Sequence, residues 1–481
     1  MAVGMLVTAC GTRVSDERLT AAGSLGAGEQ VVQGGVQSAA TSSDGGAVAA
    51  PDAPGVTAGA PAATAGPSAT KPGATAPNQT TTGTAAAAGK PAASAGSGAA
   101  APGATASAAC TKTLDPISIG QVGAFSGFLE PTLGGYRPGL AVWAAEVNAR
   151  GGVQCHPIRL SQRDDGSDPA RTTSVVQELV KSQKVVVMLA GDMPITIAAY
   201  RAAMKPTGIP TIGGDMITPD WTQDPLLYPA GGGNSINGFA GALKAAVEHT
   251  GKKKFGLVHC IEATICGLIR DNIKDMAAKA GAEVVSQQSA SLTQTDFTSQ
   301  CQSAKNAGAE LMFTALDTSS VARLFKSCAA IGFRPPTATS AIAVGPTTAS
   351  DPNVQAAGVY LNSQNMPYVN EGSPAVQEFL AAMRKYAPGV RVDQNALAAY
   401  SSGKLLEAAL AKVAEQARSG PVDSELIIRG LHLVKNETLN GLSSVPLTFK
   451  PGPHEVGNCY FVTLMDRRGI SDLTKGRPQC L

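Results

Sequence analysis

The most reactive side chains of this sequence are its nine cysteines. Cys10 follows the apolar and small residues Leu6-Val-Thr-Ala9, a pattern typical of a bacterial lipoprotein signal, in which the cysteine thiol receives a diacylglycerol group. The leader is short and lacks a basic start. We therefore predict that residues 1–10 are a lipoprotein signal truncated at its beginning. The alternative is that Cys10 occurs there by chance.

The other eight cysteines form an even set, which fits disulfide bonds outside the cytoplasm. Cys110 and Cys155 each precede an expected strand, and neighbouring parallel strands would bring both sulfurs to one sheet edge. Cys301 and Cys328 lie on successive expected helices that should cover the same sheet face. The remaining four would close short loops, although spacing alone does not fix connectivity. The predicted pairs are Cys110–Cys155, Cys301–Cys328, Cys260–Cys266 and Cys459–Cys480.

Metal and catalytic chemistry have little support in the sequence. No Cys-x-x-Cys is present and the five histidines are scattered, so we predict no metal site. Neither a Gly-x-Ser-x-Gly elbow nor a Walker loop is present, and the glycines of 120–127 do not have the dinucleotide-binding spacing. We therefore predict that the chain is not an enzyme and binds no cofactor.

Helical and strand-like segments alternate along most of the chain from residue 117 onward. Leu140, Trp143, Ala144 and Val147 share one helical stripe, for example, and Gly151 follows as a stop. Strands are expected at 117–122, 156–160, 185–189, 209–212, 255–258, 283–286, 311–315 and 459–464. Helices are expected between them and at 375–386 and 397–414. This alternation is typical of an α/β protein with doubly wound parallel sheets.

Several of these segments resemble the branched-chain-amino-acid-type substrate-binding proteins of ABC importers. The resemblance runs from about residue 115 to the end of the chain, and it rests on the order and spacing of its segments together. These segments are 139–153, 156–160, 164–169, 192–194, 208–214, 218–222, 253–258, 295–297 and 306–313.

The resemblance implies a type I periplasmic-binding fold, in which two doubly wound parallel-sheet lobes are joined by a three-segment hinge. The length of the folded part also favours two lobes. The chain is then expected to cross between lobes near 234–237, 362–366 and 443–447. Lobe I would comprise residues 111–236 and 365–445, and lobe II residues 237–364 and 446–481.

Ligands of open parallel sheets bind beyond the carboxyl ends of the strands. The loops expected there are 123–127, 191–196, 213–218, 259–266, 316–320 and 339–344. The candidate ligand-binding residues in these loops are Ser126, Asp192, Met193, Asp215, Met216, Ile217, Thr218, Thr264, Asp317 and Thr318. Each also has a structural explanation, since Asp192, Asp215 and Asp317 could cap helices and Thr218 could begin a turn.

The sequence departs from the amino-acid site that the resemblance implies. Amino-acid-binding members place hydroxyl groups against the ligand carboxylate where this chain has Met193 or Pro194, and then Ile217. They place a glutamate against the ligand ammonium where this chain has Ala341. A buried ammonium without an acidic partner is costly. A leucine-like ligand therefore requires a substitute among Asp192, Asp215, Glu262 and Asp317.

Composition separates the expected lobes from what precedes them. Residues 11–110 are almost entirely Ala, Gly, Pro, Thr and Ser, so we predict a disordered linker. The formal charge of the 481-residue chain is only +2, and the one cationic run is 252–254. These features argue against a nucleic-acid partner.

The resemblance implies an extracytoplasmic lipoprotein, anchored to the outer face of the cell membrane, that captures a small polar solute between its lobes. The implied partners are ABC permease subunits, and we expect a monomer. The alternative is a sensor of the same fold that signals to a membrane receptor or kinase. The residues do not separate these two functions.

Overall fold

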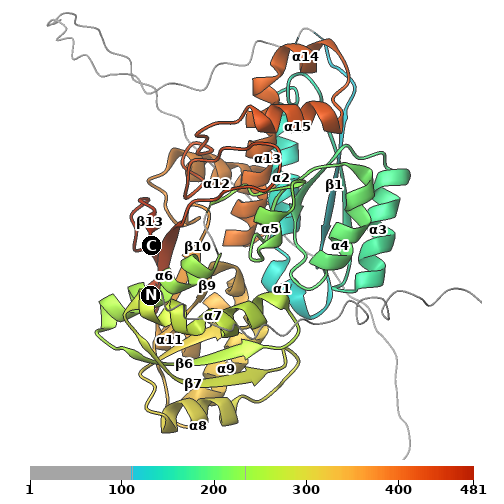
Figure 1. Cartoon of the computed structure of the whole chain (residues 1–481). Coiled ribbons are helices and arrows are strands. Elements are labelled where there is room, and N and C mark those ends of the chain that lie inside the picture. The colour runs from blue at the N-terminus through green and yellow to red at the C-terminus, as the bar shows by residue number, and fades with distance from the viewer. Residues whose placement is uncertain (1–109, 111, 233–234) are drawn as a thin grey trace, which may run out of the picture. The chain divides into compact units, whose positions relative to one another are not determined.

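Figure 1 shows the computed structural model, which describes residues 110, 112–232 and 235–481. The expected lipoprotein signal with Cys10 lies outside the described residues. The same holds for the expected linker up to residue 109.

The first sheet is parallel throughout and has the strand order β2-β1-β3-β4-β5. Its strands are β1 (Ile117–Gly123), β2 (Ile158–Asp164), β3 (Val187–Gly191), β4 (Thr211–Gly214) and β5 (Leu227–Tyr228). Helices α2 (Tyr136–Ala149) and α13 (Gln394–Lys412) cover one face, and α3 (Pro169–Lys181) and α4 (Ile197–Met204) cover the other (Figure 1). A helix from the last third of the chain therefore packs on the first sheet.

The second sheet is mixed and has the strand order β12-β11-β10-β9-β8-β6-β7, with β13 also paired to β11. Its strands are β6 (Lys254–Cys260), β7 (Glu283–Ala290), β8 (Leu311–Ala315), β9 (Thr337–Ser340), β10 (Val359–Ser363), β11 (Cys459–Asp466), β12 (Gly469–Asp472) and β13 (Gln479–Cys480). Helices α6 (Ser235–Thr250) and α7 (Thr264–Ala280) lie on one face, and α8 (Thr298–Asn306) and α9 (Thr318–Ala330) on the other (Figure 1).

The second sheet is parallel except at one edge. Strand β11 runs antiparallel to β10, and β12 and β13 run antiparallel to β11. Strand β10 ends at Ser363, and β11 starts opposite that end, with Phe461 paired to Ser363. A strand that enters the sheet where its neighbour leaves it must run in the opposite direction.

Shorter elements and a group of late helices complete the fold. The short ones are η2 (Gly127–Leu129), α1 (Glu130–Leu133), η3 (Lys205–Thr207), α5 (Asp220–Gln223), η4 (Ala341–Ala343), α10 (Pro346–Ala349) and α11 (Pro352–Ala357). The late helices are α12 (Pro374–Tyr386), α14 (Ala414–Ser419) and α15 (Ser424–His432). Helices α12 and α15 pack against α2 and α13, respectively.

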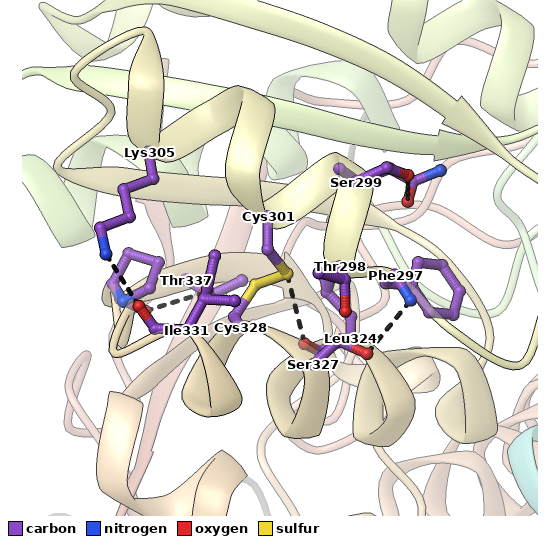
Figure 2. Close-up of a disulfide and its surroundings, with 12 residues drawn as sticks. Phe297, Thr298, Ser299, Cys301, Lys305, Leu324, Ser327, Cys328, Ile331 and Thr337 are labelled. Atoms are coloured by element: carbon purple, nitrogen blue, oxygen red, sulfur yellow. Dashed lines mark hydrogen bonds between the residues drawn. A yellow bond between two sulfur atoms is a disulfide. The ribbon is translucent and has the colours of Figure 1, made fainter.

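Four disulfides join the cysteines in the pairs expected from the sequence: Cys110–Cys155, Cys260–Cys266, Cys301–Cys328 and Cys459–Cys480. The Cys301–Cys328 bond links α8 to α9 on one sheet face (Figure 2). Two hydrogen bonds flank it, from Lys305 Nζ to the Ile331 carbonyl (2.8 Å) and from the Phe297 amide to Ser327 Oγ (3.1 Å). The bond therefore reinforces a helix pair that already packs together.

Three chain segments meet where the two sheets are joined. The Gln364 carbonyl accepts hydrogen bonds from the amides of Gly232 (3.3 Å) and Ser444 (3.1 Å). Asn365 pairs with Ser443, and its Nδ2 donates to the Ala230 carbonyl (3.0 Å). These contacts lie at or next to the predicted crossings.

One segment departs from the expected lobe boundaries. The amide of Phe449 donates to the Val434 carbonyl (3.3 Å), and that of His454 donates to the Thr222 carbonyl (2.8 Å). Both rings also pack against Tyr228 of β5. Residues 447–454 therefore pack on the first sheet, and the expected boundary at residue 446 is too early. The chain joins the second sheet only at β11.

The contact between α2 and α13 yields a stability prediction. Trp143 is fully buried, and a Cβ atom at Gly403 would lie 2.1 Å from Trp143 Cδ2. We expect Gly403→Ala to lower the free energy of unfolding by about 1–3 kcal/mol through overpacking. Chemical denaturation measures this change. Gly267→Ala in α7 is the matched control, because a Cβ there meets only one side-chain atom, at 3.9 Å. It should be neutral or stabilising, and equal effects at both glycines would contradict the packing argument.

Candidate ligand-binding site

A cavity of about 90 Å³ lies where loops from the carboxyl ends of both sheets' strands meet. Its walls are mostly apolar side chains. These include Leu129, Leu133, Ile195, Ile217, Phe239, Ile265, Ile269, Leu292, Leu316 and Ile342. The polar lining residues are Thr132, Thr314, Asp317, Thr339 and Ser340. Among the residues that the structure describes, no Lys, Arg or His lines this cavity, and Asp317 is its one acidic residue.

Helix α1, which follows β1, reaches from the first lobe to the second. Thr132 Oγ1 accepts a hydrogen bond from the Thr318 amide (2.9 Å), and the Thr132 carbonyl accepts one from Asn395 Nδ2. The backbones also approach closely, since a Cβ at Gly345 would lie 2.4 Å from the Pro131 carbonyl oxygen. Helix α1 therefore forms one wall of the cavity.

The turn from β6 into α7 forms the opposite wall. The Cys260–Cys266 disulfide bridges this turn, and both cysteines line the cavity. Glu262 also stabilises the turn: its Oε1 accepts hydrogen bonds from the Leu292 amide (2.9 Å) and from Ser291 Oγ (2.6 Å). The Glu262 carboxylate is thus bound to protein groups and is not among the cavity-lining groups.

Asp317 is the N-cap of α9, as its structural explanation anticipated. Its carboxylate accepts hydrogen bonds from the amides of Ser319 (3.0 Å) and Ser320 (3.3 Å). Burial raises the pKa of Asp317, while these hydrogen bonds and the Arg323 guanidinium act in the opposite direction. The side chain both supports the helix and contributes to the cavity wall.

Asp215 holds the loop that follows β4. Its carboxylate accepts hydrogen bonds from the Met193 amide (3.0 Å), from Trp221 Nε1 (2.9 Å) and from the Ile217 amide (3.4 Å). Burial raises the pKa of Asp215 to about 6, despite these three hydrogen bonds. Asp215 does not line the 90 Å³ cavity. It positions Ile217, which does.

Asp192 is fully buried, and neither of its carboxylate oxygens has a hydrogen-bond partner. Burial, together with the nearby charges of Asp215 and Asp165, raises the pKa of Asp192 well above the ordinary carboxyl range. Asp192 caps no helix and does not line the cavity. Its surroundings therefore favour the neutral form of the carboxyl group.

The other candidate residues lie around the cavity rather than in it. Ser126 is exposed and donates to Asp164 Oδ2 (2.5 Å), and Thr264 is exposed at the start of α7. Met193 packs in the core beneath α3 and α4. Thr318 Oγ1 accepts a hydrogen bond from the Gly345 amide (3.1 Å). Met216 and Thr218 line a separate cavity of about 420 Å³ beside Trp221.

Of the predicted ligand-binding set, Ile217 and Asp317 therefore line the cavity. Sequence reasoning missed its apolar walls, such as Leu133, Phe239 and Ile342. Five of the predicted loops, 191–196, 213–218, 259–266, 316–320 and 339–344, contribute residues to the cavity lining. A search of these loops for apolar side chains would have found several of the walls.

The sequence from residue 116 to residue 469 matches the family model described as periplasmic binding protein. The chain belongs to this family. Membership implies an extracytoplasmic location for this periplasmic binding protein. No match was found among curated protein sequences.

Solved structures with the same fold are transporter receptors of diverse ligands. A fatty acid ABC transporter substrate-binding protein from Thermomonospora curvata has a TM-score of 0.66 at 18% identity, over 78% of this chain and 93% of that one. A solute-binding protein from R. palustris in complex with benzoate has a TM-score of 0.61 at 16% identity, over 76% of this chain and 97% of that one. A branched-chain amino acid transporter substrate-binding protein from Streptococcus pneumoniae in complex with isoleucine has a TM-score of 0.59 at 20% identity, over 76% of this chain and 98% of that one. At these identities the likeness establishes the fold.

None of the helices in the described residues is long and apolar enough to span a bilayer. In the same part of the chain, no group of His, Cys, Asp and Glu side chains is arranged to hold a metal ion.

The buried carboxyl group of Asp192 gives a pH-dependent prediction. We expect Asp192→Asn to raise the free energy of unfolding at pH 7 by about 1–3 kcal/mol, because an amide keeps the buried side chain neutral without binding a proton. Because the pKa of Asp192 is higher in the folded state, the folded protein keeps a proton that the unfolded chain releases above about pH 4. Wild-type stability then falls as pH rises toward the folded-state pKa, and this slope should be shallower in the variant.

Urea denaturation between pH 4 and pH 8 measures this difference. The increase in the free energy of unfolding caused by Asp192→Asn should be smallest at pH 4 and largest at pH 8. The control is Asp275→Asn at an exposed position of α7, where we expect a change within about 0.5 kcal/mol at every pH. A pH-independent gain at Asp192 would contradict the protonation argument.

Proposed function

We propose that this periplasmic binding protein is a lipid-tethered receptor that captures a small solute between its lobes and presents it to the permease of an ABC importer. The observation that carries the proposal is the cavity enclosed by strand-end loops of both sheets. Family membership and the transporter receptors of the same fold support it. The lipoprotein pattern at Cys10 and the low-complexity segment after it fit a tethered receptor.

Capture requires that the lobes open and close around the solute. Helix α1 makes one hydrogen bond to the second lobe, from the Thr318 amide to Thr132 Oγ1. The lobes are also joined by the backbone junction at Gln364 and by hydrogen bonds from Ser235 Oγ to the Ile217 carbonyl (2.9 Å) and from Asn370 Nδ2 to Asp472 Oδ2 (2.7 Å). Breaking the Thr318–Thr132 contact while keeping the junction at Gln364 would move the two sides of the cavity apart. A solute that contacts both lobes would then favour the closed form.

The walls favour a solute with an apolar body, in place of the small polar solute expected from the sequence. Burial of apolar surface contributes about 25 cal/mol per Å², and nearly all of the lining side chains can supply such contacts. The fatty acid, benzoate and isoleucine named for the structural relatives all carry an apolar portion. The receptor is proposed to act as a monomer and without catalysis.

A thermal-shift screen of small acids, amides, amines and amino acids tests the proposal, because a ligand that binds only the folded state raises Tm by mass action. Scattering profiles should become more compact with the same compounds. If no compound of the panel changes Tm, the scattering profile or the heat measured by calorimetry, the proposal is wrong. Binding without stimulation of import by a reconstituted permease would favour the alternative sensor function.

Filling the cavity should abolish binding without unfolding the protein. Ala263 lines the cavity at the start of α7 and is only partly buried. We expect Ala263→Trp to weaken binding of any compound found in the screen at least tenfold, as measured by calorimetry. Ala307→Trp, at an exposed position after α8, is the control and should bind as the wild type does. Unchanged affinity in Ala263→Trp would place the ligand elsewhere.

A further inference from the structure

We propose that the ligand of this receptor is a small hydrophobic molecule with one hydrogen-bond-accepting end, a carboxylate or a carbonyl, which is met by Thr314 and the start of α7. The inference rests on the proposed function and specifies its ligand class. The same geometry disfavours a free amino acid, because the one carboxylate in the cavity wall, that of Asp317, already accepts two backbone amides.

Thr314 supplies the first observation. It lies in β8, is 1% exposed and lines the cavity, and its hydroxyl has no hydrogen-bond partner. Buried hydroxyl groups are nearly always hydrogen-bonded, because leaving one unpaired is costly. The ligand would supply the missing partner once the wall shifts enough to expose the oxygen, which is fully buried in this arrangement of the lobes.

The start of α7 supplies the second observation. This helix of 17 residues has Ala263 at its N-cap, with no side-chain hydrogen bond to its first turn and no acidic residue in that turn. In the described part of the chain, the amides of Thr264 and Ile265 donate to no protein group. Ala263 and Ile265 line the cavity, as Thr314 does. Free amides at a helix start favour an acceptor, and most strongly an anionic one.

The same walls offer an ammonium group only one carboxylate, that of Asp317. The carboxylate of Asp317 already accepts two amides of α9, and Glu262 accepts the Leu292 amide and the Ser291 hydroxyl. Asp192 and Asp215 do not line the cavity. A zwitterion would therefore bury its ammonium without a free acidic partner, at a high cost in free energy.

The cavity also limits the size of the ligand. Its volume of about 90 Å³ is below the roughly 150 Å³ of an apolar protein cavity that accepts benzene. In this arrangement of the lobes, the hydrophobic body that fits is therefore a short branched chain, and a single ring would require the lobes to stand slightly further apart. Long acyl chains would require the lobes to stand further apart.

Two matched series of compounds test the ligand class by calorimetry on the full chain. One comprises 4-methylpentanoate, 4-methylpentanamide, 4-methylpentylamine and leucine, and the other comprises benzoate, benzamide, benzylamine and phenylglycine. We expect the acid or the amide of at least one series to bind at least tenfold more tightly than its amine and its amino acid. Tighter binding of the acid than of the amide would identify a carboxylate, and the reverse would identify a neutral carbonyl.

The outcomes separate this inference from the proposed function. If leucine, phenylglycine or the amines bind more tightly than the acids and amides, the ligand class is wrong while the receptor function stands. If neither series binds but an amine or an amino acid of the broad screen does, the ligand class is again wrong. If nothing binds in either panel, the receptor function itself fails.

A pair of threonine variants tests the role of the hydroxyl. Thr314→Val should lower affinity for the binding acid or amide about tenfold, while Tm of the unliganded protein stays the same or rises, because an unpaired hydroxyl is removed. Thr339 also lines the cavity, but its hydroxyl donates to the Thr314 carbonyl (2.8 Å). Thr339→Val should instead lower Tm and leave the acid-to-amine preference intact. Unchanged affinity in Thr314→Val would remove that hydroxyl from the binding site.

Discussion

The placement of the cavity depends on the backbone junction at the Gln364 carbonyl, where three crossings of the chain are hydrogen-bonded side by side. Such close approach requires glycine: a Cβ at Gly232 would lie 1.9 Å from Val445 Cγ2. Because β10 ends and β11 begins at this junction, the second sheet acquires its antiparallel edge there. The same junction brings the loops of both sheets to opposite sides of one cavity.

The acidic side chains near the cavity act mainly on the loops. Asp215 holds the loop that carries Ile217, Glu262 holds the turn before α7, and Asp317 caps α9. Each carboxylate is satisfied by backbone amides, so the loops keep their shape without presenting a free charge to the cavity. Apolar side chains are then left to form the walls, and a dry cavity strengthens any hydrogen bond made inside it.

Most of the fold, but less of the site, could be predicted from the sequence. The strands and helices around Trp143 have clear periodicity, and the pairing of Cys110 with Cys155 follows from neighbouring parallel strands. Short elements such as β5 and β9 have too few residues for a periodic signal. Polar residues in strand-end loops were interpreted as ligand contacts, yet Asp215 and Asp317 bind backbone amides instead. No local pattern distinguishes a capping carboxylate from a ligand-binding one, because both follow a strand and precede a helix.

The division of the cavity into apolar walls and one unpaired hydroxyl has consequences for selectivity. An apolar wall separates ligands that differ by one methylene only about 10- to 200-fold, whereas a buried hydrogen-bonding group can reject a ligand that leaves it unpaired far more strongly. Affinity in this receptor should therefore come from residues such as Leu133 and Phe239, and discrimination from Thr314. The Cys260–Cys266 bond fixes the turn that carries the free amides of α7, so it supports the discriminating end of the cavity. Evolution of a new ligand preference could then alter the walls while the polar end stays unchanged.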